Sequence, residues 1–315
     1  MSTTERRKLG ATDIEVSSLG VGAWAWGDSL TWGYGRGYGR SDVEAAYRAS
    51  RESGIDLIDT AEIYGLGRSE RLLSEFLRAS PSGAVVATKF FPYPWRLSRS
   101  ALLRALRRSL KRLGLPRVDL YQIHFPLPPI APRTWAEELV RAVELGLTRA
   151  VGVSNYDRRQ MEETHRLLAA HGVPLATNQV EFSLLERGPE RTGLLESCLA
   201  SDVTVIAYSP LAMGLLTGKY TPNHPLPMAR RRAFPWVDLK RLRNLIQALR
   251  EVGQNHGGKT PGQVALNWVI SKGALPIPGA KNAAQAHENA GALGWRITED
   301  EARHLEQVAD RVSAR

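Results

Sequence analysis

Residues 55–65, IDLIDTAEIYG, show the pattern that decides the fold. An apolar run suited to a buried β-strand ends on a carboxylate, Asp59, and a tyrosine, Tyr64, follows shortly after it. The arrangement returns in the next two apolar runs, because 84–89 (AVVATK) ends in a lysine and 119–124 (DLYQIH) ends in a histidine. Polar side chains at the ends of successive buried strands are typical of a parallel sheet whose strand ends form one site.

Short apolar runs alternate with longer amphipathic ones along the chain. The predicted strands are 18–23, 56–59, 84–89, 119–124, 150–154, 176–181, 203–208 and 275–279. Helical spacing of apolar residues lies between them, at 42–53, 69–78, 98–113, 134–145, 157–171, 192–201 and 260–272. This alternation predicts an α/β fold, the (β/α)8 TIM barrel. We expect one domain over residues 1–315, with extra C-terminal helices at 282–292 and 299–311 and a short N-terminal hairpin.

A doubly wound parallel sheet is the alternative fold, since it also alternates strands and helices. It usually carries a glycine-rich first turn. The stretch GYGRGYGR, residues 33–40, lacks the third glycine of G-x-G-x-x-G in either register. The stretch GLLTGKY, residues 214–220, is one residue short of a Walker A spacing and has no Ser or Thr after Lys219. Neither known phosphate-loop motif is therefore present.

Composition excludes several classes of protein. The single cysteine, Cys198, cannot form an internal disulfide and indicates a reducing compartment, so we expect a cytoplasmic protein. No stretch approaches the roughly 18 apolar residues of a membrane span, and the N-terminus lacks the apolar segment of a secretory signal. The net charge of +10 is spread over amphipathic helices such as 98–113, so it does not indicate nucleic-acid binding. No histidine pair has the spacing of metal ligands, so no metal is expected.

Polar side chains lie at most of the predicted strand ends. Those on the second to seventh strands are Asp59, Lys89, His124, Ser154 with Asn155, Gln179, and Tyr208 with Ser209 and Pro210. Each has an ordinary structural alternative, because a carboxylate can cap a turn, a lysine can reach solvent, and a histidine or tyrosine can pack in a core. In a barrel, however, the carboxyl ends of the strands meet in one mouth. Their joint occurrence therefore favours one site.

Chemistry supplies a reason for combining these groups. A phenol has a pKa of about 10, so Tyr64 alone is a poor acid-base catalyst at neutral pH. An ammonium from Lys89 would lower that pKa, and Asp59 would keep the buried ammonium charged and in place. A neutral imidazole from His124 would hydrogen-bond the same substrate oxygen. The set predicts proton exchange between Tyr64 and a carbonyl oxygen.

With these residues, the sequence resembles the aldo-keto reductases over nearly its whole length. The resembling stretches are GIDLIDTAEIYGLGRSE, VVATKF, VDLYQIHFP, AVGVSNY, TNQVEFSLL, IAYSPLAMGLLTGKY and PIPGAKNAAQAHENAGAL, in this order. The resemblance implies an NADPH-dependent oxidoreductase on a (β/α)8 barrel, with NADPH/NADP+ as cofactor and a small carbonyl compound as substrate. It places Asp59, Tyr64, Lys89 and His124 on the family's catalytic tetrad, with Tyr64 as proton donor.

The resemblance also implies a cofactor site. The nicotinamide half falls on Trp24, Ser154, Asn155, Gln179 and Tyr208, the pyrophosphate loop on Ser209, Pro210, Leu211, Gly214 and Lys219, and the adenosine half on Gly279, Lys281, Gln285, Glu288 and Asn289. Arg230 matches an arginine near the cofactor, although MARRRAF leaves the register open by one residue. One branch of the family has Lys-Ser where this chain has Gly279-Ala280. Lys281 is expected to pair with a 2′-phosphate, which favours NADPH over NADH.

The substrate is harder to predict. Trp24, Trp32 and Trp95 are expected to line an apolar pocket, and packing within the structure is an equal alternative for all three. The tryptophan-rich stretches are most similar to those of pyridoxal reductases and related plastid and cyanobacterial reductases, which makes pyridoxal to pyridoxine a candidate reaction. An NADP-binding regulatory subunit, similar to the potassium-channel β-subunits and with little turnover, is the alternative function. Monomer and homo-oligomer both stay open.

Overall fold

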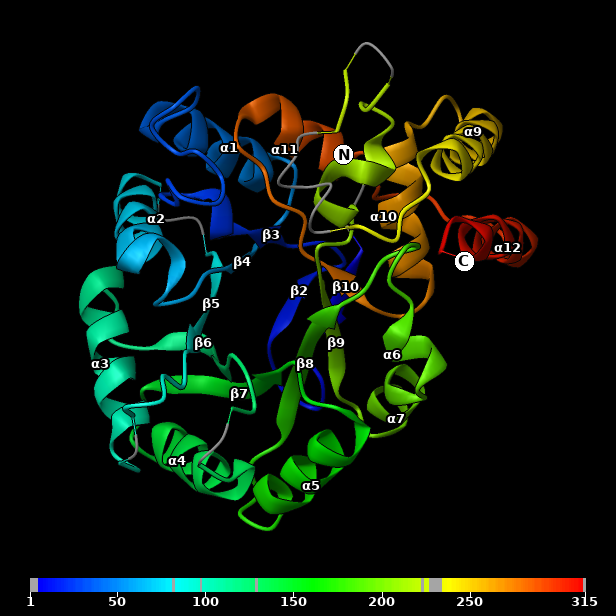
Figure 1. The fold of residues 1–315 in the computed structure, drawn as a ribbon. Helices are drawn as coiled ribbons and strands as arrows, with labels where there is room; N and C mark the ends of the chain where they lie inside the picture. The colour runs from blue at the N-terminus through cyan, green and yellow to red at the C-terminus, as the bar shows by residue number, and fades with distance from the viewer. Residues whose placement is uncertain are drawn as a thin grey trace.

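Eight parallel strands form the centre of the molecule. The computed structural model describes residues 5–80, 83–96, 98–127, 130–221, 224–226 and 234–313. Within these ranges one sheet has the strand order β10-β9-β8-β7-β6-β5-β4-β3, and helices surround it (Figure 1). Its strands are β3 (Val21–Gly22), β4 (Leu57–Asp59), β5 (Val85–Phe90), β6 (Val118–Ile123), β7 (Thr148–Ser154), β8 (Leu175–Glu181), β9 (Thr204–Tyr208) and β10 (Leu275–Pro276). The predicted (β/α)8 barrel is confirmed.

Each predicted helical stretch corresponds to a helix of the structure. These helices are α1 (Arg40–Glu52), α2 (Arg68–Ala79), α3 (Ala101–Leu113), α4 (Pro132–Glu144), α5 (Arg158–Ala169), α7 (Leu194–Ala200), α10 (Pro261–Ser271), α11 (Ala283–Ala290) and α12 (Glu299–Ser313). The short α6 (Gly188–Arg191) and the long α9 (Leu239–Asn255) were not predicted. Helix α9 buries Leu242, Leu245 and Leu249 on one face, so its apolar spacing was a usable signal. No helix in the described ranges is long and apolar enough to cross a membrane.

The ring of strands closes between β3 and β10. The backbone N–H of Gly20 donates to the Pro276 carbonyl at 2.9 Å, and that of Gly22 donates to the Pro278 carbonyl at 3.1 Å. The backbones approach so closely that a Cβ on Gly22 would lie 2.8 Å from the carbonyl oxygen of Ile277. Closure leaves no free sheet edge on this side, and it depends on glycine at the contact.

The interior of the barrel is layered along its axis. Its apolar layer is built from strand side chains and from the N-terminal hairpin, and contains Leu9, Ile14, Val16, Leu57, Val85, Ala87, Leu120, Ala150, Ala176, Ile206, Leu275 and Ile277. The predicted hairpin is present as β1 (Arg6–Lys8) paired antiparallel with β2 (Glu15–Ser17), and β2 appears within the ring of strands in Figure 1. Because side chains alternate along a strand, the residue two positions after an inward apolar one also points inward. The carboxyl ends of the strands therefore carry the polar layer.

We predict that Gly22→Ala lowers the free energy of unfolding by roughly 1–3 kcal/mol, because the new methyl group forces the β3 and β10 backbones apart. Urea denaturation followed by circular dichroism measures the change. Gly262→Ala is the matched control, since its Cβ would meet nothing closer than 3.8 Å and alanine suits a helix. Equal stability of the Gly22→Ala and wild-type proteins would contradict the role given to this contact.

Candidate active site

The polar layer is organised around Lys89. This side chain rises from β5 and is fully buried. Its Nζ forms an ion pair with Asp59 of β4, and it donates to the Thr60 carbonyl at 3.0 Å and to the Tyr64 hydroxyl at 3.3 Å. Three acceptors thus match the three protons of the ammonium. A buried charge is tolerated only when it is paired and hydrogen-bonded, and this one is both.

Tyr64 reaches the ammonium from a tight turn after β4. It begins the 3-10 segment η2 (Tyr64–Gly67), in which Gly65 has a φ of +54°. A side chain at Gly65 would meet the carbonyl of Gly27, so the turn requires glycine there. The Tyr64 ring stacks on Trp24 with ring centroids 5.9 Å apart and meets the His124 ring edge-on at 5.8 Å. These contacts fix the phenol beside Lys89.

Burial decides the charge states of this pair. It raises the pKa of Tyr64 above its ordinary value, and the nearby Lys89 ammonium opposes that rise only in part. Lys89 does lower the pKa of the phenol, as predicted from the sequence, but the loss of solvent around the phenol has the larger effect. Burial alone would lower the pKa of Lys89, but Asp59 and Tyr64 together raise it by more than burial lowers it. The net shift of the Lys89 pKa is therefore upward. At neutral pH the phenol is therefore protonated and the ammonium charged.

His124 lies directly after β6 and is neutral. Burial, and secondarily the Lys89 charge, holds its pKa well below the ordinary value. The ring stacks on Phe125 and meets Phe91 edge-on, with centroids 5.1 and 5.5 Å away. Its Nδ1 is buried and has no hydrogen-bond partner within the described part of the chain. A buried ring nitrogen of this kind is stabilised when a ligand or water supplies the missing bond.

A hydrogen-bonded chain joins the ends of β7, β8 and β9. The Ser154 hydroxyl donates to the backbone carbonyl of Gln179 at 2.8 Å, and the Asn155 amide donates to the Ser154 hydroxyl at 3.1 Å. The Tyr208 hydroxyl donates to Asn155 Oδ1 at 2.9 Å. The Gln179 amide donates to Asp59 Oδ1 at 2.9 Å. The structure thus connects four of the five residues predicted around a nicotinamide to the Asp59–Lys89 pair, and the fifth, Trp24, stacks on Tyr64.

The backbone beside this chain is strained. Non-glycine residues rarely adopt positive φ, yet Asn155, Ser209, Ala212 and Met213 have φ values of 61°, 51°, 46° and 52°. Ser209 lies in the turn after β9, which also holds Pro210 and Leu211, and Ala212 and Met213 begin η3 (Ala212–Thr217) directly after it. At Gly214, where φ is +92°, a Cβ would lie 2.6 Å from Lys219 Nζ. Strained turns of this kind cluster at ligand sites.

The predicted adenosine residues lie around the start of α11. The backbone N–H of Lys281 donates to Gln285 Oε1 at 2.9 Å, and the Asn289 amide donates to the Gly279 carbonyl at 3.3 Å. Lys281 Nζ donates to the Trp32 carbonyl at 3.0 Å and lies 4.5 Å from the centroid of the Tyr38 ring. Glu288 instead accepts a hydrogen bond from Thr260, directly before α10. Arg230 lies outside the described residues.

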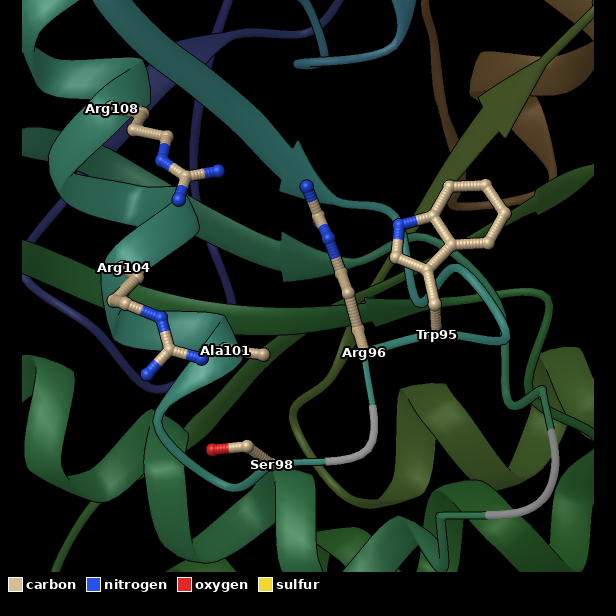
Figure 2. Close-up of a pocket in the computed structure, with 6 residues that line it drawn as sticks. All are labelled: Trp95, Arg96, Ser98, Ala101, Arg104 and Arg108. Carbon is tan, nitrogen blue, oxygen red and sulfur yellow. The ribbon is translucent and has the colours of Figure 1, made fainter.

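The three predicted pocket tryptophans fall in two places. Trp24, 37% exposed, stacks on Tyr64 and meets Trp32 edge-on at 5.5 Å, so the Trp24 indole lies against the phenol and Trp32 packs behind it. Trp95 is 73% exposed and stacks on Tyr93. It borders a pocket of about 240 Å³ with Arg96, Ser98, Ala101, Arg104 and Arg108 (Figure 2). That pocket is strongly basic and contains no tetrad residue.

Three residues that support the site, Gln122, Thr177 and Glu62, were not predicted from the sequence. Gln122, fully buried on β6, donates to Asp59 Oδ1 at 3.2 Å. Thr177 on β8 donates to Gln122 Oε1 at 3.2 Å. Glu62 forms an ion pair with Arg96, which ties the turn that carries Tyr64 to the segment after β5. The sequence did carry a signal for Gln122, because it precedes His124 by two positions and side chains two positions apart on a strand point to the same face.

Comparison with known proteins identifies the family. The aldo/keto reductase family model matches residues 18–310, and the chain belongs to that family. A chloroplastic pyridoxal reductase of Arabidopsis thaliana is 41% identical, over 96% of this chain and 86% of the relative. L-glyceraldehyde 3-phosphate reductase of Escherichia coli K12 is 30% identical, over 91% of this chain and 87% of the relative.

Solved structures agree with this placement. A glycerol dehydrogenase from Gluconobacter oxydans aligns with a TM-score of 0.84 at 27% identity, covering 99% of this chain and 97% of that one. An aldo/keto reductase from Klebsiella pneumoniae, solved in complex with NADP and acetate, aligns with a TM-score of 0.76 at 28% identity, covering 96% and 94%. The chain is therefore an aldo/keto reductase, an oxidoreductase.

We predict that the free energy of unfolding falls as the pH drops below about 6.5. In that range His124 takes up a proton in the unfolded chain but stays neutral in the folded chain, because its pKa is lowered there. The slope from this group is at most about 1.4 kcal/mol per pH unit. His124→Gln should flatten the dependence in urea denaturation between about pH 5 and pH 7, whereas replacing the exposed His171 by Gln should not. A His124→Gln profile as steep as that of the wild type would show that His124 is not the group responsible.

Proposed function

We propose that this chain reduces aldehydes or ketones to alcohols, with NADPH as hydride source and Tyr64 as proton donor. The observation that carries the proposal is the shared ammonium of Lys89, bound at once to Asp59, the Thr60 carbonyl and the Tyr64 hydroxyl. Such an arrangement holds a protonated phenol beside a fixed positive charge. The charge stabilises the phenolate that remains once the proton has been given away.

The residues around the strand ends suit a dinucleotide. Tyr208 offers an aromatic face next to Asn155, and the strained turn after β9 leads to Gly214 and Lys219. Lys281 lies near the start of α11, and a helix N-terminus attracts phosphate. The Klebsiella relatives were solved with NADP and with NADPH. We assign the nicotinamide to Ser154, Asn155, Gln179 and Tyr208, and the 2′-phosphate to Lys281.

In the proposed mechanism the chain orients the carbonyl and moves one proton. Bound NADPH supplies the hydride for the carbonyl carbon. The Tyr64 hydroxyl gives its proton to the carbonyl oxygen, and neutral His124 hydrogen-bonds the same oxygen and sets its direction. Lys89 stabilises the resulting phenolate, and Asp59 holds Lys89 in position. Trp24 packs on one face of the Tyr64 ring, and Trp32 packs edge-on against Trp24.

For the substrate we propose an aromatic aldehyde, with pyridoxal as the leading candidate. The support is the 41% identity to a pyridoxal reductase and the aromatic cluster beside the phenol, in which Trp24 stacks on Tyr64 and Trp32 packs against Trp24. A flat ring with a carbonyl group can stack against such a cluster. The role of Trp95 as a pocket residue, the cytoplasmic location and the single domain over 1–315 remain predictions.

We predict that the wild-type protein oxidises NADPH in the presence of pyridoxal or 4-nitrobenzaldehyde and that Tyr64→Phe lowers kcat roughly a hundredfold or more, since the proton donor is lost. Decay of NADPH absorbance measures the rate, and fluorescence titration checks that the variant still binds NADPH. Tyr47→Phe, a core change distant from the tetrad, is the control. Undiminished turnover in Tyr64→Phe would refute the assigned role. Tight NADPH binding without turnover in the wild type would favour the regulatory subunit instead.

We also predict that Lys281→Ala weakens NADPH binding roughly tenfold or more and leaves NADH binding nearly unchanged, because only NADPH carries the 2′-phosphate that a charged hydrogen bond would hold. Fluorescence titration with each cofactor measures both Kd values. Any change in Kd that comes from losing the Lys281 contacts to Trp32 and Tyr38 is the same for NADPH and NADH, so the difference between the two changes in Kd reports on the 2′-phosphate. An equal loss for NADPH and NADH would contradict the assignment.

A further inference from the structure

The Asp59 carboxylate is held by two amides as well as by Lys89. Its Oδ2 pairs with the Lys89 ammonium, while its Oδ1 accepts from Gln179 Nε2 at 2.9 Å and from Gln122 Nε2 at 3.2 Å. All four side chains are buried. Because a buried carboxylate oxygen without a donor is costly, these two amides help to keep Asp59 ionised and aimed at Lys89.

The Gln122 and Gln179 amides differ in whether they can remain bound to Asp59 when a cofactor binds. Gln179 belongs to the proposed nicotinamide site, so its side chain is shared between Asp59 and the cofactor. Gln122 lies one layer below, beside Lys89 in the register of β5 and β6. Its Oε1 accepts from the Thr177 hydroxyl at 3.2 Å and from Gln179 Nε2 at 3.4 Å. Gln122 is thus anchored at both ends of its amide.

A glycine opens the space for this anchor. Gly152 of β7 lies between Gln122 and Thr177 in the sheet, paired with each of them. A Cβ on Gly152 would collide with the Thr177 hydroxyl and would lie 3.1 Å from Gln122 Cγ. Only a residue without a side chain lets β6 and β8 exchange a hydrogen bond across β7. The backbone is therefore built to hold the Gln122 amide in one orientation.

We propose that Gln122 is a positioning residue that keeps Asp59 hydrogen-bonded and directed at Lys89 when Gln179 turns to the cofactor. The inference rests on the proposed function, since it takes Gln179 as a nicotinamide ligand. Gln122 acts through Asp59 and touches neither substrate nor cofactor. Without Gln122, Gln179 would be the only amide that donates to Asp59 Oδ1. Gln179 could then turn to the cofactor only by leaving that buried oxygen without an amide donor, and this cost would weaken cofactor binding.

Gln122→Met tests this, because methionine keeps the length of the side chain and removes the donor. We expect the NADPH Kd to rise roughly tenfold to a hundredfold, the range for one hydrogen bond to a charged group. Fluorescence titration measures the Kd, and thermal melting of the unliganded protein checks the fold. Tyr121→Phe, the neighbouring residue on the other face of β6, is the matched control and should bind as the wild type does. An unchanged Kd in Gln122→Met, or an equal rise in Tyr121→Phe, would overturn the proposal.

Gln122→Glu supplies a second readout that a merely structural role would not move. Two neighbouring carboxyl groups share a proton, so this variant can donate to Asp59 only while the proton is retained. We expect a Kd near the wild-type value at about pH 6 and a Kd that rises above it as the pH increases. A ratio to the wild-type Kd that stays constant with pH would contradict the proposal.

Failure of the proposed function is visible separately. It would appear as wild-type protein that does not bind NADPH, before any variant is compared. If the wild-type protein binds NADPH and turns over substrate, but Gln122→Met has the same NADPH Kd as the wild type, only the role proposed for Gln122 is overturned.

Discussion

The buried ion pair between Lys89 and Asp59 is the constraint on which the rest of the site depends. An ammonium inside a barrel is stable only if a carboxylate and further acceptors surround it, and removing one partner of such a pair typically costs about 3–5 kcal/mol. The pair therefore dictates its neighbours. Asp59 Oδ1 needs its own donors, which Gln122 and Gln179 supply, and the third proton of the ammonium is directed at Tyr64.

The barrel makes this arrangement possible by separating two layers. Aliphatic side chains from the strands and the N-terminal hairpin fill one end of the interior, and the polar network begins two residues further along the strands. A packed apolar floor excludes water from beneath Lys89, so the charges interact in a medium of low polarity. The same exclusion raises the pKa of Tyr64 and lowers that of His124. Both groups are consequently neutral at neutral pH, one a proton donor and the other free to hydrogen-bond an oxygen.

Glycines determine how closely these parts approach. Gly22 closes the ring of strands against Ile277, Gly65 sets the turn that presents Tyr64, and Gly152 lets Thr177 reach Gln122. None of the three has an apolar or charged side chain that a periodicity analysis would register. No role for any of the three could be predicted from the sequence. Their function follows from atoms contributed by distant strands, which the linear sequence does not display.

The sequence by itself determined the alternation of strands and helices, and hence the barrel, because apolar periodicity and the polar residues at strand ends are local signals. It also placed Asp59, Lys89 and His124 at the ends of successive strands. Helix α9 was missed although its apolar face was readable. Only the tertiary structure decided that burial outweighs Lys89 in setting the pKa of Tyr64, and that Gln122 supports Asp59. Solvent exclusion and contacts across strands depend on residues far apart in the chain, and no local pattern carries them.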